Sequence, residues 1–148
     1  MSFNPRYDTL VRDAARSLGQ DPEAVVRDEG LLLDGFIIAL AYEGSASSGD
    51  ILFVTELGVP LQSREQEVHR TLLSANNFWI NTGGATLGIQ SETGCVVLCG
   101  RFNLELLDGD LLAAMLRHFV GIAGMWQMYV TDRVPTGVPA PPLGAFRV

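Results

Sequence analysis

The side chains most often used in catalysis are few in this sequence and lie far apart. The chain has 2 histidines, His69 and His118, and they match neither the His-x3-His nor the His-Glu-x2-His spacing that places two zinc ligands on one helix face. His69 lies in "REQEVHR", whose charges are typical of a solvated helix face. No serine occupies a G-x-S-x-G elbow. We therefore expect no catalytic residue, no metal site and no cofactor.

Two glycine-containing stretches do not fit a phosphate loop. The stretch "GSASSGD", residues 44–50, lacks the lysine of a P-loop. In "NTGGATLG", residues 81–88, the glycines precede a predicted strand, whereas the glycines of a phosphate loop open a helix. The sequence therefore gives no indication of nucleotide binding.

Cys95 and Cys99 are the only cysteines, and both lie on a predicted strand. Four residues along a strand keep two side chains on one face but separate them by about 13 Å, which is too far for a relaxed disulfide. A Cys-x3-Cys pair with no further cysteine is also a weak zinc signal. We expect two free thiols.

One junction could still carry a function. In "LLSANNFWINTGGATLGIQ", residues 72–90, two asparagines stand beside Phe78 and Trp79 where a predicted helix ends. A ligand pocket at Asn76 and Asn77 is one interpretation, and a surface made for another protein chain is a second. The Asn76 amide would either satisfy nearby backbone groups or pair with its copy across a two-fold axis, while Asn77 faces solvent.

Hydrophobic periodicity predicts the elements that position this junction. We expect helices over residues 6–18, 63–79 and 108–129, and strands over residues 36–43, 51–57, 85–89 and 95–102. Asn4 and Pro5 fit the start of the first helix, and Ser63 with Gln66 forms a capping box for the second. The "LLLDG" stretch could add a short strand with a tight turn, and Asp21-Pro22 could open a helical turn.

This order of elements predicts an α+β fold. We expect an antiparallel, twisted sheet of about five strands with three helices, in α-β-β(-β)-α-β-β-α order. Residues 1–131 would form a single domain, and residues 132–148 a proline-rich tail that is extended or disordered. Both faces of the 36–43 strand are apolar, so both should be covered.

Composition limits the partners. The formal net charge is −7, the pI is about 4.6 and 47% of the residues are hydrophobic, which argues against nucleic acid and anionic membranes. The N-terminus lacks the apolar stretch of a signal peptide, and no run approaches the roughly 18 apolar residues of a membrane span. We expect a cytosolic protein whose excess apolar surface is either packed in a monomer or covered by a partner.

The segment from Leu72 to Trp126 resembles the C-terminal signature of the class I type III secretion chaperones, the Tir-chaperone (CesT) family. The matching features are a Leu-Leu-x-Ala-Asn run at 72–76, a glycine break at 83–84, a hairpin over 87–98, a Leu-Asp step at 107–108 and a leucine-rich helix over 111–126. The first helix and the first hairpin also match in their order along the chain, so that the resemblance covers residues 6–130. It consists of apolar spacing rather than of unusual residues.

The resemblance implies a small acidic homodimer in the cytoplasm of a Gram-negative bacterium, with no catalysis and no cofactor. Such a protein binds the N-terminal chaperone-binding segment of a secreted effector, keeps it soluble and partly unfolded, and aids its delivery to the secretion apparatus. The secretion-system ATPase is a further candidate partner. The alternative is a regulatory adaptor of the same fold that binds a folded secretion-system or transcription partner.

On this basis we assign two candidate surfaces. The predicted dimer interface consists of Val68, Leu72, Asn76, Trp79 and Leu87. The predicted effector-binding surface consists of Leu10, Val11, Phe36, Ile38, Leu40, Leu52 and Val54. An extended guest needs apolar patches for its side chains and a sheet edge for its backbone, and a two-fold dimer doubles the surface that it can use.

Overall fold

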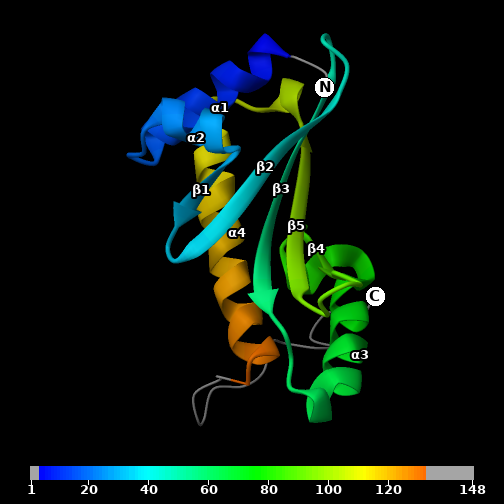
Figure 1. Ribbon diagram of the computed structural model, residues 1–148. Coiled ribbons are helices and arrows are strands. Elements are labelled where there is room, and N and C mark those ends of the chain that lie inside the picture. The colour runs from blue at the N-terminus through cyan, green and yellow to red at the C-terminus, as the bar shows by residue number, and fades with distance from the viewer. Residues whose placement is uncertain (1–3, 133–148) are drawn as a thin grey trace. The chain divides into compact units, whose positions relative to one another are not determined.

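The computed structural model describes residues 4–132, and the predicted proline-rich tail lies outside this range from residue 133 onward (Figure 1). The described helices are α1 (Pro5–Ser17), α2 (Pro22–Asp28), α3 (Glu65–Asn76) and α4 (Gly109–Val130). The strands are β1 (Gly30–Leu33), β2 (Phe36–Gly44), β3 (Gly49–Gly58), β4 (Thr86–Ile89) and β5 (Val96–Asn103). Short 3-10 turns are η1 (Gln62–Arg64), η2 (Asn77–Thr82) and η3 (Leu104–Leu106).

The five strands form one sheet in the order β1-β2-β3-β5-β4, so β1 and β4 are its two edges. The predicted antiparallel α+β fold is confirmed, with α2 as a fourth helix. Strands β1 and β2 are joined by a two-residue turn in which Asp34 and Gly35 have φ of 49° and 85°. Two successive positive φ values are typical of the type I′ turn, which Asp-Gly favours in hairpins.

Internal contacts divide the described residues into two compact units. Unit 1 comprises residues 4–54 and 100–120, and unit 2 comprises residues 55–99 and 121–132. Strands β3 and β5 and helix α4 each contribute residues to both units. We describe each unit by itself.

In unit 1, local signals fix the start of α1. Asn4 is the N-cap, its side-chain oxygen accepts from the N–H groups of Arg6 and Tyr7, and Pro5 occupies the first turn. Both predictions for this helix start are confirmed. Helix α2 packs beside α1 (Figure 1) and is capped by Asp21, which satisfies an N–H that the helix itself cannot pair.

An aromatic cluster in unit 1 extends from the buried Phe53 and Phe119 to the exposed Phe102. The Phe53 ring lies edge-on to Phe119 with ring centroids 4.9 Å apart and stacks on Phe102 at 6.1 Å. Gly100 lies against the same ring, and a Cβ there would collide with it. This glycine is therefore needed for close packing rather than for a special backbone conformation.

In unit 2, the core is organised around Trp126, which is fully buried. Its indole Nε1 donates to the Asn81 carbonyl oxygen at 3.1 Å, and its ring meets that of Tyr129 edge-on at 5.8 Å. The Tyr129 hydroxyl donates to the Thr71 hydroxyl oxygen at 2.8 Å. Each polar atom of these large side chains thus has a partner, as burial requires.

The middle helix differs from its prediction at both ends. Helix α3 begins at Glu65 after Arg64, which makes no side-chain cap hydrogen bond, so the predicted capping box at Ser63 is wrong. It ends at Asn76 rather than at Trp79, because Phe78 and Trp79 adopt φ of 58° and 54°. These left-handed residues stop the α-helix and turn the chain toward β4.

Candidate protein-binding surfaces

Most of the predicted effector-binding residues lie in the core of unit 1. Leu10, Val11, Ile38 and Leu40 are each at most 6% exposed. Phe36, Leu52 and Val54 are partly exposed. The prediction of effector binding stays a prediction for all seven residues, but in this structure the four buried ones pack in the core and are not part of the accessible surface.

The outward face of the sheet in unit 1 carries several exposed apolar side chains. Ile37 is 75% exposed and Leu32 is 61% exposed, and the two lie directly opposite each other on β2 and β1. Ala39 on β2 is also exposed, and Leu52 and Val54 on β3 are half-buried. We call Leu32, Ile37, Ala39, Leu52 and Val54 the sheet-face patch.

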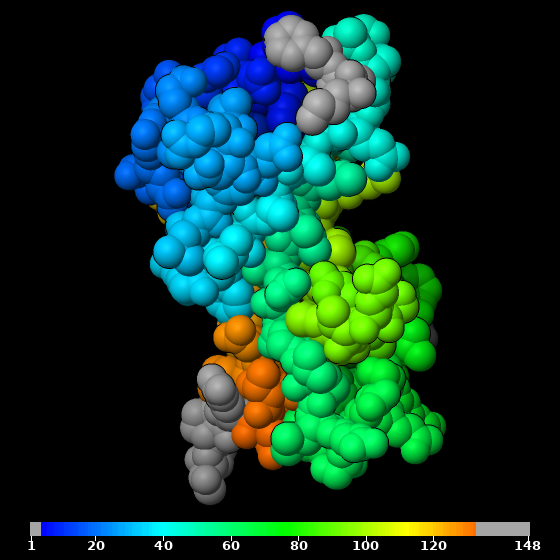
Figure 2. Space-filling view, in the orientation of Figure 1, coloured from blue at the N-terminus to red at the C-terminus, as the bar shows by residue number. Residues whose placement is uncertain are grey.

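This face shows that the covering predicted for both sides of β2 is absent within unit 1. Ile38 and Leu40 are buried, whereas Ile37, Ala39 and Ala41 are exposed. Residues alternate across a strand, so one complete face of β2 meets solvent. The hairpin of β1 and β2, blue to cyan, lies at the surface in Figure 2.

A second exposed apolar surface lies in unit 2, where α3, η2 and β4 contact one another. Its members are Leu73 (75% exposed), Phe78 (57%), Trp79 (54%), Ile80 (40%) and Ile89 (42%), which we call the η2 patch. A left-handed conformation at a bulky residue costs roughly 1–2 kcal/mol. Unit 2 therefore holds two strained aromatic residues in place while leaving both largely exposed.

The predicted dimer residues are divided between this patch and the core beneath it. Val68, Leu72 and Leu87 are at most 4% exposed, so they support α3 and β4 from inside unit 2. Trp79 is 54% exposed and belongs to the η2 patch. The role of these residues in a dimer stays a prediction.

Asn76 connects α3 to β4. Its Nδ2 donates to the Leu87 carbonyl oxygen at 2.9 Å, and the Leu87 N–H donates to its Oδ1 at 2.9 Å. The side-chain amide thus pairs with one backbone residue as a neighbouring strand would. Of the two roles expected for Asn76, satisfying backbone groups is the one that the structure shows. Asn77 is exposed as predicted.

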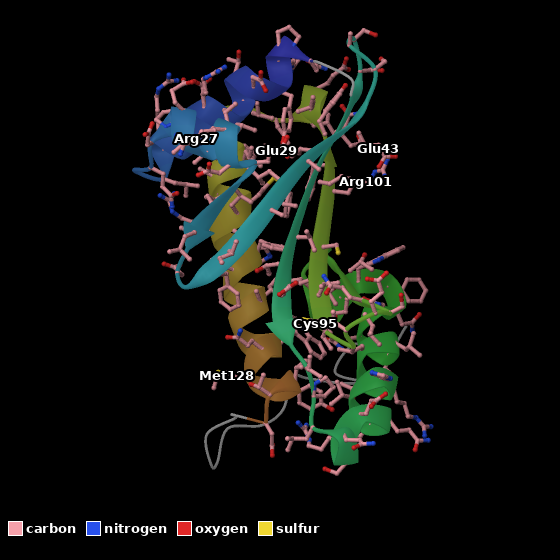
Figure 3. All side chains as sticks on the ribbon, viewed as in Figure 1. Arg27, Glu29, Glu43, Cys95, Arg101 and Met128 are labelled. Carbon is pink, nitrogen blue, oxygen red and sulfur yellow. The ribbon has the colours of Figure 1, made fainter. Side chains whose placement is uncertain are left out.

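A cluster of charged side chains in unit 1 connects β2, β3 and β5. Arg101 pairs with Asp50 at 2.7 Å and with Glu43 at 3.4 Å (Figure 3). Burial, followed by the charges of Glu29 and Asp8, raises the pKa of Tyr7 to about 12. The Tyr7 phenol is therefore neutral at physiological pH and acts as a packing group rather than as an acid or base.

The cysteines are free thiols, as predicted. Burial raises the pKa of the Cys99 thiol, and a raised pKa lowers the thiolate fraction that reacts or binds metal. Among residues 4–132, no group of three or more His, Cys, Asp or Glu residues is placed to hold a metal ion. Within that same range, no helix combines the length and apolar character that crossing a membrane requires.

Comparison with known proteins identifies the family. Residues 9–127 match the Tir chaperone protein (CesT) family. The chain belongs to this family. The resemblance that the sequence motifs indicated is thereby confirmed. The members of this family are type III secretion chaperones, which bind effectors and perform no catalysis. No curated protein sequence matches the chain significantly.

Several solved structures share the fold. A chain of the ExsC–ExsE complex has 20% identity and a TM-score of 0.68, over 90% of this chain and 100% of that chain. A chain of the ExoT–SpcS complex from Pseudomonas aeruginosa has 21% identity and a TM-score of 0.59, over 82% and 97%. The structure of the Yersinia pestis type III secretion chaperone SycH, in complex with a stable fragment of YscM2, has 18% identity and a TM-score of 0.59, over 81% of this chain and 98% of that chain. At this identity the likeness shows the fold alone.

Sequence reasoning missed several exposed residues, above all Leu32, Ile37 and Phe78. A signal for the first two was available, because the Asp34-Gly35 turn fixes the register of β1 and β2 and so pairs Leu32 with Ile37. What the sequence did not reveal was which face of the hairpin is buried. For Phe78 no local signal exists, since a left-handed phenylalanine is intrinsically unfavourable.

Proposed function

We propose that this CesT-family chain binds the N-terminal chaperone-binding segment of a secreted effector in an extended form. It keeps that segment soluble and partly unfolded, and it aids delivery to the secretion apparatus in the bacterial cytoplasm. The observation that carries the proposal is the sheet-face patch, in which large apolar side chains of β1 and β2 meet solvent in unit 1. Docking of the loaded chaperone on the secretion-system ATPase belongs to the same proposal.

The dimensions of the patch suit an extended guest. Successive side chains of an extended segment point alternately toward and away from a surface, so every second guest residue can rest on the sheet. Fully burying a leucine or isoleucine side chain is worth about 1.5–3 kcal/mol. Since Leu32 and Ile37 are 61% and 75% exposed, covering both would contribute roughly 2–4 kcal/mol, which helps to offset the ordering of the guest.

We further propose that the chain forms a homodimer through the η2 patch. Three observations support this surface: five large apolar side chains on contacting elements, their exposure of at least 40%, and two aromatic residues held at positive φ. Exposed apolar area of this kind marks interaction surfaces, and strained residues persist where function uses them. A two-fold axis would present two sheet-face patches to one guest.

We also infer that residues 1–131 act as one domain and that the proline-rich tail from residue 132 lies outside it. Three elements that run through both compact units support the first part of this proposal. The family match over residues 9–127, which ends before the tail, supports the second.

Co-expression with the N-terminal segment of an effector encoded beside this gene tests the proposed function. The wild-type chain should co-purify with the segment, and Ile37→Asp should weaken binding by at least about tenfold because it places an unpaired charge in the patch. The matched control is Leu106→Asp, since Leu106 is 74% exposed in unit 1 but outside the patch. Equal binding by both variants would remove the sheet-face patch from the proposal.

A further inference from the structure

The two edges of the sheet are closed to different degrees. At β4, the side chain of Asn76 pairs with both backbone polar groups of Leu87, each at 2.9 Å. These bonds are part-buried. Just before this strand, the Ala85 N–H donates to the Thr82 carbonyl oxygen of η2 at 3.0 Å. The N–H of Ala85 and both backbone polar groups of Leu87, which a further strand would need, are therefore already in use.

The length of β4 makes this closure effective. Strand β4 has 4 residues, and in an antiparallel ladder alternate residues direct their N–H and C=O groups to the same side. Because Leu87 directs both groups toward Asn76, residues 86 and 88 face β5, and the outer side of β4 has positions 87 and 89. With Leu87 occupied, an added strand could pair with at most one complete residue of β4.

The opposite edge, β1, is held much more loosely. The side-chain nitrogen of Gln20 donates to the Leu32 carbonyl oxygen at 2.5 Å, and this bond is exposed. A single bond from a flexible glutamine is easily replaced by the N–H of an incoming strand, whereas the Asn76 amide holds a donor and an acceptor together. Strand β1 also carries Leu32 of the sheet-face patch.

We propose that Asn76 is a specificity-determining residue that closes the β4 edge to strand addition. Its amide takes the place of a neighbouring strand, so an extended guest, or β4 of a second copy, finds no free ladder there. Backbone pairing is thereby directed away from β4, and contacts near it are made by the side chains of the η2 patch. For the identity of the guest, this inference rests on the proposed function.

Hydrogen exchange at the Leu87 amide tests the closure without any effector, and so its failure is distinguishable from failure of the proposed function. In the full-length Asn76→Ala variant, exchange at Leu87 should accelerate by about tenfold or more. The variant should also form concentration-dependent assemblies larger than those of the wild type, measured by sedimentation velocity, because an opened edge pairs with other copies. Asn77→Ala is the matched control, since its exposed neighbouring amide should leave both measurements unchanged.

A second variant keeps the size of the side chain. The ionised carboxylate of Asn76→Asp can accept from the Leu87 N–H but repels the Leu87 carbonyl oxygen. Once protonated, it can donate to that carbonyl again. Its larger assemblies should therefore form at neutral pH and disappear in mildly acid solution, which a purely structural role would not produce. If Asn76→Ala does not fold, this pH dependence decides the question.

The inference is overturned if Asn76→Ala retains wild-type protection at Leu87. It is equally overturned if the variants lose stability while their assembly state remains that of the wild type at every pH. In either case the edge of β4 would be closed by something other than Asn76.

Discussion

Replacing Trp79 should weaken the association of the chain with a second copy while the chain still folds. Trp79 is 54% exposed at a φ of 54°. A tryptophan can bury up to about 250 Å², so roughly 130 Å² of this residue remains for a partner. At about 25 cal/mol per Å², covering it contributes about 3 kcal/mol for each protomer and about 6 kcal/mol for a symmetric pair.

Trp79→Ala should therefore weaken dimerisation strongly. Allowing for incomplete coverage and other losses on association, we expect a cost of about 3–6 kcal/mol, or a rise in the dimer dissociation constant of roughly 10²- to 10⁴-fold. Analytical ultracentrifugation over a concentration series measures this constant. Circular dichroism verifies the fold, and Leu106→Ala serves as the exposed control outside the η2 patch.

The backbone strain at this position predicts a second effect, on the stability of the monomer rather than on dimerisation. Trp79→Gly removes the same side chain as Trp79→Ala but also relieves the left-handed conformation, which costs an alanine roughly 1–2 kcal/mol. The greater freedom of glycine in the unfolded chain offsets part of this gain. The glycine variant should therefore be about 0.5–1 kcal/mol more stable than the alanine variant in urea unfolding of the monomers. An unchanged dimer, or a less stable glycine variant, would refute the reasoning.

Three further predictions concern groups away from the two patches. Because the pKa of Tyr7 is raised from 10.0 to about 12, unfolding between these pH values releases its proton. The free energy of unfolding should therefore fall as pH rises from about 10 to about 12. Phenolate absorbance, with Tyr7→Phe as reference, follows the titration of this residue. Burial raises the pKa of Cys99, so this thiol should be alkylated more slowly at neutral pH than the thiol of a fully exposed cysteine. Mass spectrometry of a Cys95→Ser variant measures the rate. The Arg64 guanidinium donates at 3.0 Å to a last-turn carbonyl of α4, so Arg64→Ala should lower the free energy of unfolding in denaturant by about 2 kcal/mol. The control Arg70→Ala removes an exposed arginine and should lower it by less than about 0.5 kcal/mol.

The elements that depend on local chemistry were predictable from the sequence. The start of α1 follows from the Asn4 cap and Pro5, and the β1–β2 hairpin follows from the Asp34-Gly35 turn. In both cases the residues that decide the structure are neighbours in the chain. The thiol state of the cysteines was equally accessible, because strand spacing alone separates them.

The features that depend on tertiary contacts were not predictable in the same way. The end of α3 at Asn76 comes with a side-chain amide that pairs with Leu87, 11 residues further on, and with two left-handed aromatic residues that no local preference favours. The exposed face of β2 is equally hidden, since Ile37 and Ile38 are identical in type but opposite in burial. Period-2 alternation distinguishes two faces without saying which of them is inward.

Hydrogen exchange of the chaperone, alone and with the N-terminal segment of its co-encoded effector, tests the central claim most directly. The account predicts that the segment binds and that exchange slows in β1 and β2, residues 30–44, where the sheet-face patch lies. It also predicts that the segment itself remains without the protection pattern of a folded domain. A segment that fails to bind, or a complex in which residues 30–44 exchange as in the free chain, would contradict it.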